Sequence, residues 1–305
     1  MDSKKRAWLL IAVMAALCGG SVWGVIWYRS RPLSTAALLR RMPAADALVV
    51  YIDFSELRRA GILRLLSSTA GQDPDYQKFV RKTDFDYTQD LDAALLSFAP
   101  AGRYMFLRGR FDWKNLRDYV RESGGDCYNA LCNMIGSSPE RRISFYPVQS
   151  RLMAMAVSRE ESAVLRLQGA GSGPLPEPPN APIWISIPAA TLRSGDALPE
   201  GTRMFARTLE RADNVTLGFS PEGERLAARL EVRCRNEQDA ADISAQLTRA
   251  TSLLKDMIER EHHQPNPADM SGVLTSGTFR SEGRLVRGYW PIERAFLENM
   301  LSGAG

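Results

Sequence analysis

Two cysteines that stand five residues apart form the best-placed reactive pair of the 305-residue chain. Cys127 and Cys132 lie in the segment GGDCYNALCNM, where a short loop could close as a disulfide in an oxidising compartment or keep two free thiols. The spacing leaves both alternatives open. A metal site would need two further ligands nearby, and the segment offers none. The other cysteines, Cys18 and Cys234, stand alone.

The histidines and the acidic residues do not form a catalytic set. The two histidines, His262 and His263, are adjacent at the end of a predicted helix. We interpret them as part of a solvated helix C-terminus, where the helix dipole favours charged imidazole. The densest acidic segment, KTDFDYTQDLD, lacks the glycine and closing glutamate of a calcium loop and is interpreted as a polar loop before a strand that starts near Ala93. No phosphate loop, dinucleotide fingerprint, zinc-protease motif or nucleophile elbow occurs. We therefore predict no catalytic residue, no metal site and no cofactor.

The segment AWLLIAVMAALCGGSVWGVIWY, Ala7–Tyr28, holds 22 residues without a charge. As a helix that rises about 1.5 Å per residue it spans roughly 33 Å, close to the thickness of a bilayer core. Aromatic residues at both of its ends suit the membrane interfaces. The apolar run continues past the candidate cleavage site Ala16-Leu17-Cys18, so we predict an uncleaved, single-pass anchor instead of a signal peptide.

The net charge of +4 comes from the flanks of this segment. Residues 1–31 hold five basic residues and one acidic residue, which is the whole excess, so residues 32–305 are formally neutral. A neutral body argues against a nucleic-acid surface, because phosphate binding needs clustered positive charge. The short tail before the span and the large body after it predict a protein of the bacterial inner membrane whose body lies outside the cytoplasm, although basic residues flank the span on both sides.

Two stretches of the body open in the same way. ALVVYIDFSELRR, from Ala47, and PIWISIPAATLRS, from Pro182, each consist of an apolar run, a helix start and Leu-Arg, and they align at an offset of 135. DAALLSFAPAG, from Asp92, and DNVTLGFSPEG, from Asp213, align at an offset of 121 and end in Pro-x-Gly, which predicts a hairpin turn. The next two matches along the chain have offsets of 125 and 133. The increase from 121 to 125 predicts that the second copy of this hairpin is four residues longer than the first.

These matches predict an internal duplication and an α+β fold of two tandem units behind the transmembrane helix. Each unit is expected to be an antiparallel sheet with helices, in the order strand–helix–strand–strand–helix–strand–strand–helix. One continuous sheet built from two half-domains is the alternative. The stretch GAGSGPLPEPPNAP between the copies indicates a linker. The predicted division is a tail and anchor over 1–31, a first repeat over 32–168, the linker over 169–182 and a second repeat over 183–305.

The stretch MPAADALVVYIDFSELRRAG, together with the anchor, resembles the start of an uncharacterised bacterial family of N-terminally membrane-anchored proteins. The bodies of those proteins open with a similar Pro-Ala-Asp-Ala-apolar phrase. The resemblance covers Pro43–Gly61 and the anchor, and it implies no assigned chemistry.

The sequence therefore favours a membrane-anchored, non-enzymatic interaction or ligand-binding module. The alternative is a membrane-tethered extracytoplasmic hydrolase with its site at the junction of the two repeats. A cleft at that junction holding a carboxylate with a raised pKa would favour the hydrolase, whereas a filled junction would favour the binding module.

Small residues recur at every fourth position of the predicted span, at Ala12, Ala16, Gly20 and Gly24. Four residues advance a helix by about 400°, so these residues form one slowly turning stripe along which two helices could approach closely. The stripe predicts a homodimer within the membrane.

Replacing both Gly20 and Gly24 by isoleucine should lower self-association of the span in a membrane two-hybrid assay, because bulky side chains keep the two backbones apart while insertion is unaffected. The control pair, Val13→Ile with Ile26→Val, lies off the stripe and should leave self-association unchanged. An equal effect of the two pairs would mean that the span is only an anchor.

Overall fold

The computed structural model describes residues 32–44, 46–63, 73–169, 178–194, 209, 211–223, 225–261 and 264–302. The predicted span with its stripe of Ala12, Ala16, Gly20 and Gly24 lies outside these ranges, as do His262 and His263. Among the residues within them, no helix is both long enough and apolar enough to cross a membrane.

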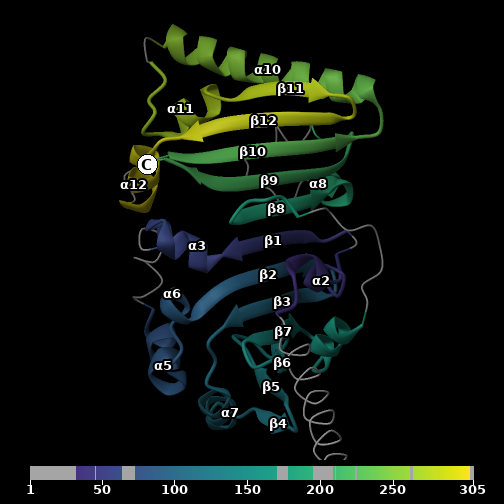
Figure 1. Cartoon of the computed structure of the whole chain (residues 1–305), viewed down its shortest axis with the longest axis vertical. Coiled ribbons are helices and arrows are strands. Elements are labelled where there is room, and N and C mark those ends of the chain that lie inside the picture. Colours follow the sequence, from purple (N-terminus) through teal and green to yellow (C-terminus); the bar gives the residue numbers. More distant parts are fainter. Residues whose placement is uncertain are drawn as a thin grey trace, which may run out of the picture.

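One antiparallel sheet of twelve strands runs through the described chain (Figure 1). Its strand order is β11-β12-β10-β9-β8-β1-β2-β3-β7-β6-β5-β4, so the first seven strands in sequence fill one half and the last five fill the other. The first half consists of β1 (Leu48–Asp53), β2 (Leu91–Ala99), β3 (Gly102–Gly109), β4 (Asp126–Tyr128), β5 (Leu131–Ile135), β6 (Arg142–Gln149) and β7 (Leu152–Ser158). The second half consists of β8 (Ile183–Pro188), β9 (Ala212–Glu222), β10 (Arg225–Cys234), β11 (Thr278–Glu282) and β12 (Leu285–Ile292).

The pairing of β1 with β8 at the centre of the sheet shows that the expectation of two tandem α+β units was wrong. Val49 lies opposite Ser186, and the Asp53 amide donates a hydrogen bond to the Pro182 carbonyl with an N···O distance of 2.6 Å. Each half alone would present an unpaired edge strand, which is prone to association, and pairing the two edges covers both. The fold is instead a single, mostly antiparallel sheet with a few helices.

Residues that align in the sequence occupy the same ladder positions in the two halves. Phe98 of β2 and Phe219 of β9 each pair with two residues across the sheet. One partner belongs to a central strand, and the other belongs to the second strand of the same hairpin. Those partners are Leu48 and Arg103 in the first half and Ile183 and Ala228 in the second. The two halves therefore share one strand register, and their origin by duplication stays a prediction.

Side chains cap the N-termini of the helices that follow the hairpins. Helix α7 (Trp113–Glu122) begins after Asp112, whose carboxylate accepts hydrogen bonds from the amides of Lys114 and Asn115. The longer α10 (Glu237–Arg260) begins after Asn236, whose side chain accepts a hydrogen bond from the Asp239 amide. Such caps satisfy amides of the first turn that have no partner within the helix.

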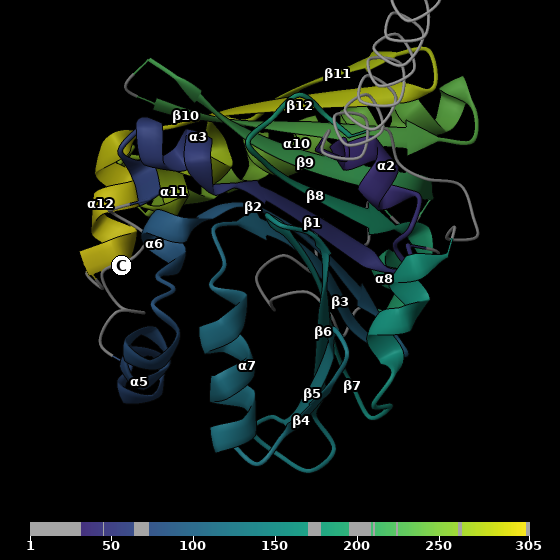
Figure 2. The ribbon, with the colours of Figure 1, turned by 60° about the horizontal axis from the view of Figure 1, so that its bottom comes forward.

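Helices cover the two faces of the sheet unequally (Figure 2). On one side, named the helix face, α7 packs on the first half and α10 on the second, and both bury aliphatic residues against the strands. On the opposite side, named the groove face, α2 (Thr35–Leu39) and the 3-10 helix η2 (Ala163–Gln168) pack only on the first half. The other helices are α3 (Phe54–Arg59), α5 (Pro74–Thr83), α6 (Tyr87–Asp90), α8 (Ala189–Ser194), α11 (Met270–Thr275) and α12 (Arg294–Ser302).

Trp184 packs the two halves against each other on the groove face. It belongs to β8 of the second half, yet it is 1% exposed and packs within the buried cluster of the first half. Its ring stacks on Tyr51 of β1, with 5.7 Å between the ring centroids. The side chains at the centre of the sheet therefore belong to one core.

Replacing Trp184 by alanine should lower the free energy of unfolding by about 3–5 kcal/mol, because it leaves a large cavity where the halves meet. Urea unfolding followed by circular dichroism measures the change. Tyr128→Ala is the control, since Tyr128 is 78% exposed, and it should change the free energy of unfolding by at most about 0.5 kcal/mol. A loss below about 1 kcal/mol for Trp184→Ala, or separate transitions for the two halves of the wild-type sheet, would contradict a shared core.

Candidate ligand-binding groove

A groove of about 760 Å³ lies on the groove face of the second half, over β9, β10, β12 and β11. Strand residues that point to this face form its floor, and the segment Pro178–Ala181, which precedes β8, forms one wall. The floor residues are Thr216, Gly218 and Ser220 of β9, Arg229 and Glu231 of β10, Arg287 and Tyr289 of β12, and Thr278 and Arg280 of β11.

The floor of the groove is polar at positions that are apolar in the other half of the sheet. In the first half, Leu95, Phe106 and Ala154 lie side by side across three strands and are buried. The residues at the same ladder positions of the second half are Thr216, Glu231 and Arg287. The shared register therefore leads to opposite surfaces, a core in one half and a polar floor in the other.

Arg229 and Tyr289 are held in place by one carboxylate. Glu222 accepts a 2.9 Å interaction from the Arg229 guanidinium and a 2.6 Å hydrogen bond from the Tyr289 hydroxyl, one on each of its oxygens. The Arg229 guanidinium also lies 5.8 Å from the centroid of the Tyr289 ring. The hydrogen bond to Glu222 raises the pKa of Tyr289, and burial and the negative charge of Glu222 add to this effect. These side chains form a closed set that fixes one side of the floor.

A second carboxylate joins two arginines on the other side of the floor. Glu282 contacts the Arg280 guanidinium at 2.9 Å with one oxygen and the Arg287 guanidinium at 2.9 Å with the other. The two arginines lie directly opposite each other in the β11–β12 pair. Like charges in that position are unfavourable, and Glu282 offsets only one of them. Arg280, Arg287 and Glu282 together therefore keep one net positive charge.

The wall comes close to the floor at Gly218. A Cβ atom at that position would lie 3.2 Å from the Cβ of Ala181, which is a tight contact. The absence of a side chain at Gly218 lets the segment before β8 cross β9 at this short distance. The wall itself is mostly apolar, since it contains Pro178, Pro179 and Ala181.

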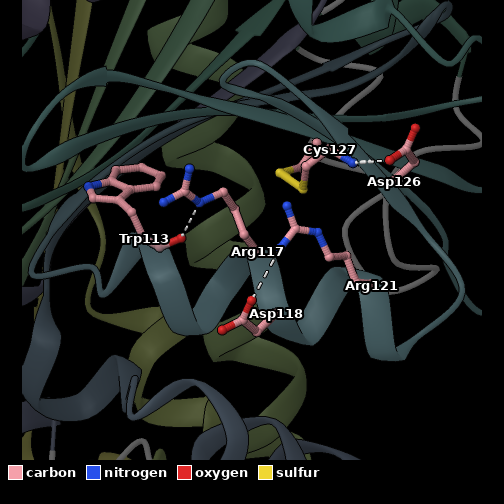
Figure 3. The surroundings of a disulfide bond; sticks show 7 residues. Trp113, Arg117, Asp118, Arg121, Asp126 and Cys127 are labelled. Carbon is pink, nitrogen blue, oxygen red and sulfur yellow. Dashed lines mark hydrogen bonds and ion pairs between the residues drawn. A yellow bond between two sulfur atoms is a disulfide. The ribbon is translucent and has the colours of Figure 1, made fainter.

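The predicted cysteine pair lies at the far edge of the sheet and takes no part in the groove. Cys127 and Cys132 are directly opposite each other in the β4–β5 hairpin and form a disulfide, so of the two alternatives that the sequence left open the structure has the bonded one. Arg121 of α7 reaches toward the bond, whereas the Arg117 guanidinium turns to the Trp113 carbonyl and donates a 3.1 Å hydrogen bond to it (Figure 3). The disulfide closes the short edge hairpin. Cys234 is a free, buried thiol whose pKa is raised by burial.

Three of the four aspartates of the acidic segment around the start of β2 take part in local structure. Asp86 caps α6, accepting hydrogen bonds from the Thr88 amide at 2.9 Å and from the Tyr76 hydroxyl at 3.0 Å. Burial acts to raise the pKa of Asp86, but these hydrogen bonds outweigh burial and lower it. Asp90 and Asp92 form ion pairs with Arg110 and Arg151, respectively. Within the described ranges, no group of three or more His, Cys, Asp or Glu residues could hold a metal ion.

The sequence predictions did not include the groove, although a signal for it is present. The strand RLAARLEVRC alternates charged and apolar residues, which places Arg229, Glu231 and Arg233 on one side. The offset of 125 aligns Arg229 and Glu231 with Tyr104 and Phe106, which are buried. Where matched positions change from apolar to charged residues, the half with the charged residues is expected to leave its sheet face exposed to solvent.

Three solved structures of TP0453, in crystal forms I, III and IV, are similar to this chain over most of both lengths. Each is 11% identical; they cover 89%, 87% and 87% of this chain and 99%, 97% and 95% of TP0453, with TM-scores of 0.48, 0.49 and 0.46, respectively. At these values the likeness carries no argument about function. No protein-family model matches the sequence, and no curated protein matches it.

The Tyr289–Glu222 pair predicts a titration that can be measured. Glu222→Gln should lower the pKa of Tyr289 toward its ordinary value, because it removes both the carboxylate acceptor and the negative charge that disfavours tyrosinate. A raised pKa in the folded state means that the pair stabilises the protein below the unfolded pKa of tyrosine, and this stabilisation is lost as pH rises through the folded pKa. Nuclear magnetic resonance of ring-labelled tyrosine, with Tyr289→Phe to assign the signal, measures the pKa. An identical titration in wild type and Glu222→Gln would contradict the pairing.

Proposed function

We propose that this protein is a membrane-anchored, non-enzymatic module that binds a ligand in the groove of an extracytoplasmic body. The observation that carries the proposal is the polar floor. Positions that are buried and apolar in the first half are occupied by Thr216, Glu231 and Arg287 in the second. Among the described residues, no helix packs over this floor, whereas α2 and η2 cover the matching strands of the first half.

The construction of the floor suits binding more than structural support. An open sheet face needs only scattered polar residues to stay in water, but here Glu222 and Glu282 each hold two side chains in fixed positions. Side chains that are oriented before a ligand arrives lose less conformational entropy when it binds. A concave site with a few oriented polar groups and an apolar wall is the usual composition of a small-molecule site.

The proposed anchor and location rest on the sequence. The apolar segment Ala7–Tyr28 is long enough to span a bilayer, and the excess basic residues flank it. The disulfide between Cys127 and Cys132 suits an oxidising compartment, because cytosolic thiols are normally kept reduced. Tethering would concentrate the groove at the outer surface of the inner membrane.

The hydrolase alternative has less support. On the groove face, the junction of the halves is filled by the stacked rings of Tyr51 and Trp184. Two carboxylates in the described ranges have shifted pKa values, and both are lowered: Asp86, where hydrogen bonds outweigh burial, and Asp269, through its hydrogen bond from Ser271. A general acid would need a raised pKa near the reacting bond.

The proposed function predicts that a ligand of the groove stabilises the protein without being consumed. The full chain in detergent is screened by thermal unfolding against amino acids, short peptides, sugars and phosphate esters. At a concentration of 100 times its dissociation constant, a ligand adds about 2.7 kcal/mol, which raises the midpoint by several degrees. Thr216→Trp, which fills the floor, should abolish the shift, and Gln246→Trp on the exposed side of α10 should keep it. A shift that survives Thr216→Trp, or turnover of the compound, would refute the proposal.

A further inference from the structure

The charged residues of the floor form one row across three strands. Glu231 of β10 lies directly opposite Arg287 of β12, which lies directly opposite Arg280 of β11. The row therefore carries one negative charge followed by two positive charges. Its order restricts the kind of ligand that could lie along it.

The positive end of the row is suited to a carboxylate. Arg280 and Arg287 are 70% and 47% exposed and share only Glu282. A guanidinium has five N–H donors, so one carboxylate between two guanidinium groups leaves further N–H donors on two residues that line the groove. Two adjacent guanidinium groups offer the planar, paired donors that bind a carboxylate strongly.

The negative end of the row is suited to an ammonium group. Glu231 is exposed on the floor, and no described residue forms an ion pair or a hydrogen bond with its carboxylate. Arg287 lies opposite but contacts Glu282 instead. Because Glu231 would repel a phosphate or another purely anionic ligand, the row favours a molecule that carries both charges.

The length of the row favours a peptide over a single amino acid. Glu231 and Arg280 are separated by two strand spacings, which amounts to about 10 Å. An extended peptide covers about 3.3–3.6 Å per residue, so three residues place the two terminal charges this far apart. The apolar wall of Pro178, Pro179 and Ala181 offers contacts for the side chains of such a peptide.

We propose that the groove binds a short peptide with free termini in an extended conformation, its carboxylate on Arg280 and Arg287 and its ammonium group on Glu231. This inference rests on the proposed function and specifies the class of ligand. The peptide crosses the strands, with the proline wall and the row of Gly218, Arg229 and Tyr289 beside it.

The test uses trialanine as the probe and isothermal titration calorimetry on the full chain in detergent. Trialanine should bind, and both N-acetyl-trialanine and trialanine amide should bind at least ten times more weakly, because each lacks one terminal charge. This comparison needs no change to the protein. Equal affinities for the three peptides would overturn the inference.

Variants assign each terminus to its partner. Arg280→Gln combined with Arg287→Gln should weaken trialanine at least tenfold and remove the difference between trialanine and its amide. Glu231→Gln should remove the difference between trialanine and its acetylated form. Arg233→Gln, on the same strand and the same face but outside the groove, should leave all three affinities unchanged. Unchanged thermal midpoints without ligand show that the variants are folded. Persistence of both differences in the variants would overturn the assignment.

The result also separates this inference from the proposed function. If trialanine does not bind while another class of compound is stabilising and is blocked by Thr216→Trp, the groove is a binding site and the peptide inference is wrong. If no compound binds in the groove, both are wrong.

Discussion

The pairing of β1 with β8 is the interaction on which the rest of the sheet depends. It joins the first strand of each half through direct backbone hydrogen bonds, and it buries Trp184 in the core of the other half. Because paired residues of adjacent strands point to the same face, this register fixes which face of the second half continues each face of the first. It also removes two of the four free edges that separate units would have had. The sheet continues without a break through the centre of the molecule (Figure 1).

A common register does not lead to a common surface. On the helix face both halves bury apolar residues, under α7 in the first half and α10 in the second. On the groove face α2 and η2 cover only the first half, where Tyr104 and Phe106 are buried. At the same ladder positions the second half carries Arg229 and Glu231, whose charges would be costly to bury without partners. The polarity of two strands thus separates a structural half from a half with an open, charged groove.

The cysteine and charged side chains of the chain are divided between local structure away from the groove and the floor of the groove. The disulfide of Cys127 and Cys132 and the cap formed by Asp86 stabilise local structure away from the groove. Glu222 and Glu282 instead orient side chains of the floor. None of the ion pairs of the floor is buried, so each contributes little to stability, and their effect lies in where they hold the guanidinium groups.

Local patterns determined much of this protein. Alternating apolar residues and Pro-x-Gly turns identified the hairpins, and offsets of 121 and 125 anticipated the equal ladder positions of Phe98 and Phe219. The uncharged segment Ala7–Tyr28 predicts an anchor, a prediction that falls outside the described residues. The state of Cys127 and Cys132, the merging of the halves into one sheet and the existence of the groove were decided only by tertiary structure. The sheet and the groove depend on which distant strands become neighbours, and strand edges carry no side-chain pattern that specifies their partner. The disulfide depends on the register of the β4–β5 hairpin, which places the two cysteines directly opposite each other. The row from Glu231 to Arg280 exists only because β10, β12 and β11 are adjacent, an order that differs from their order in the chain.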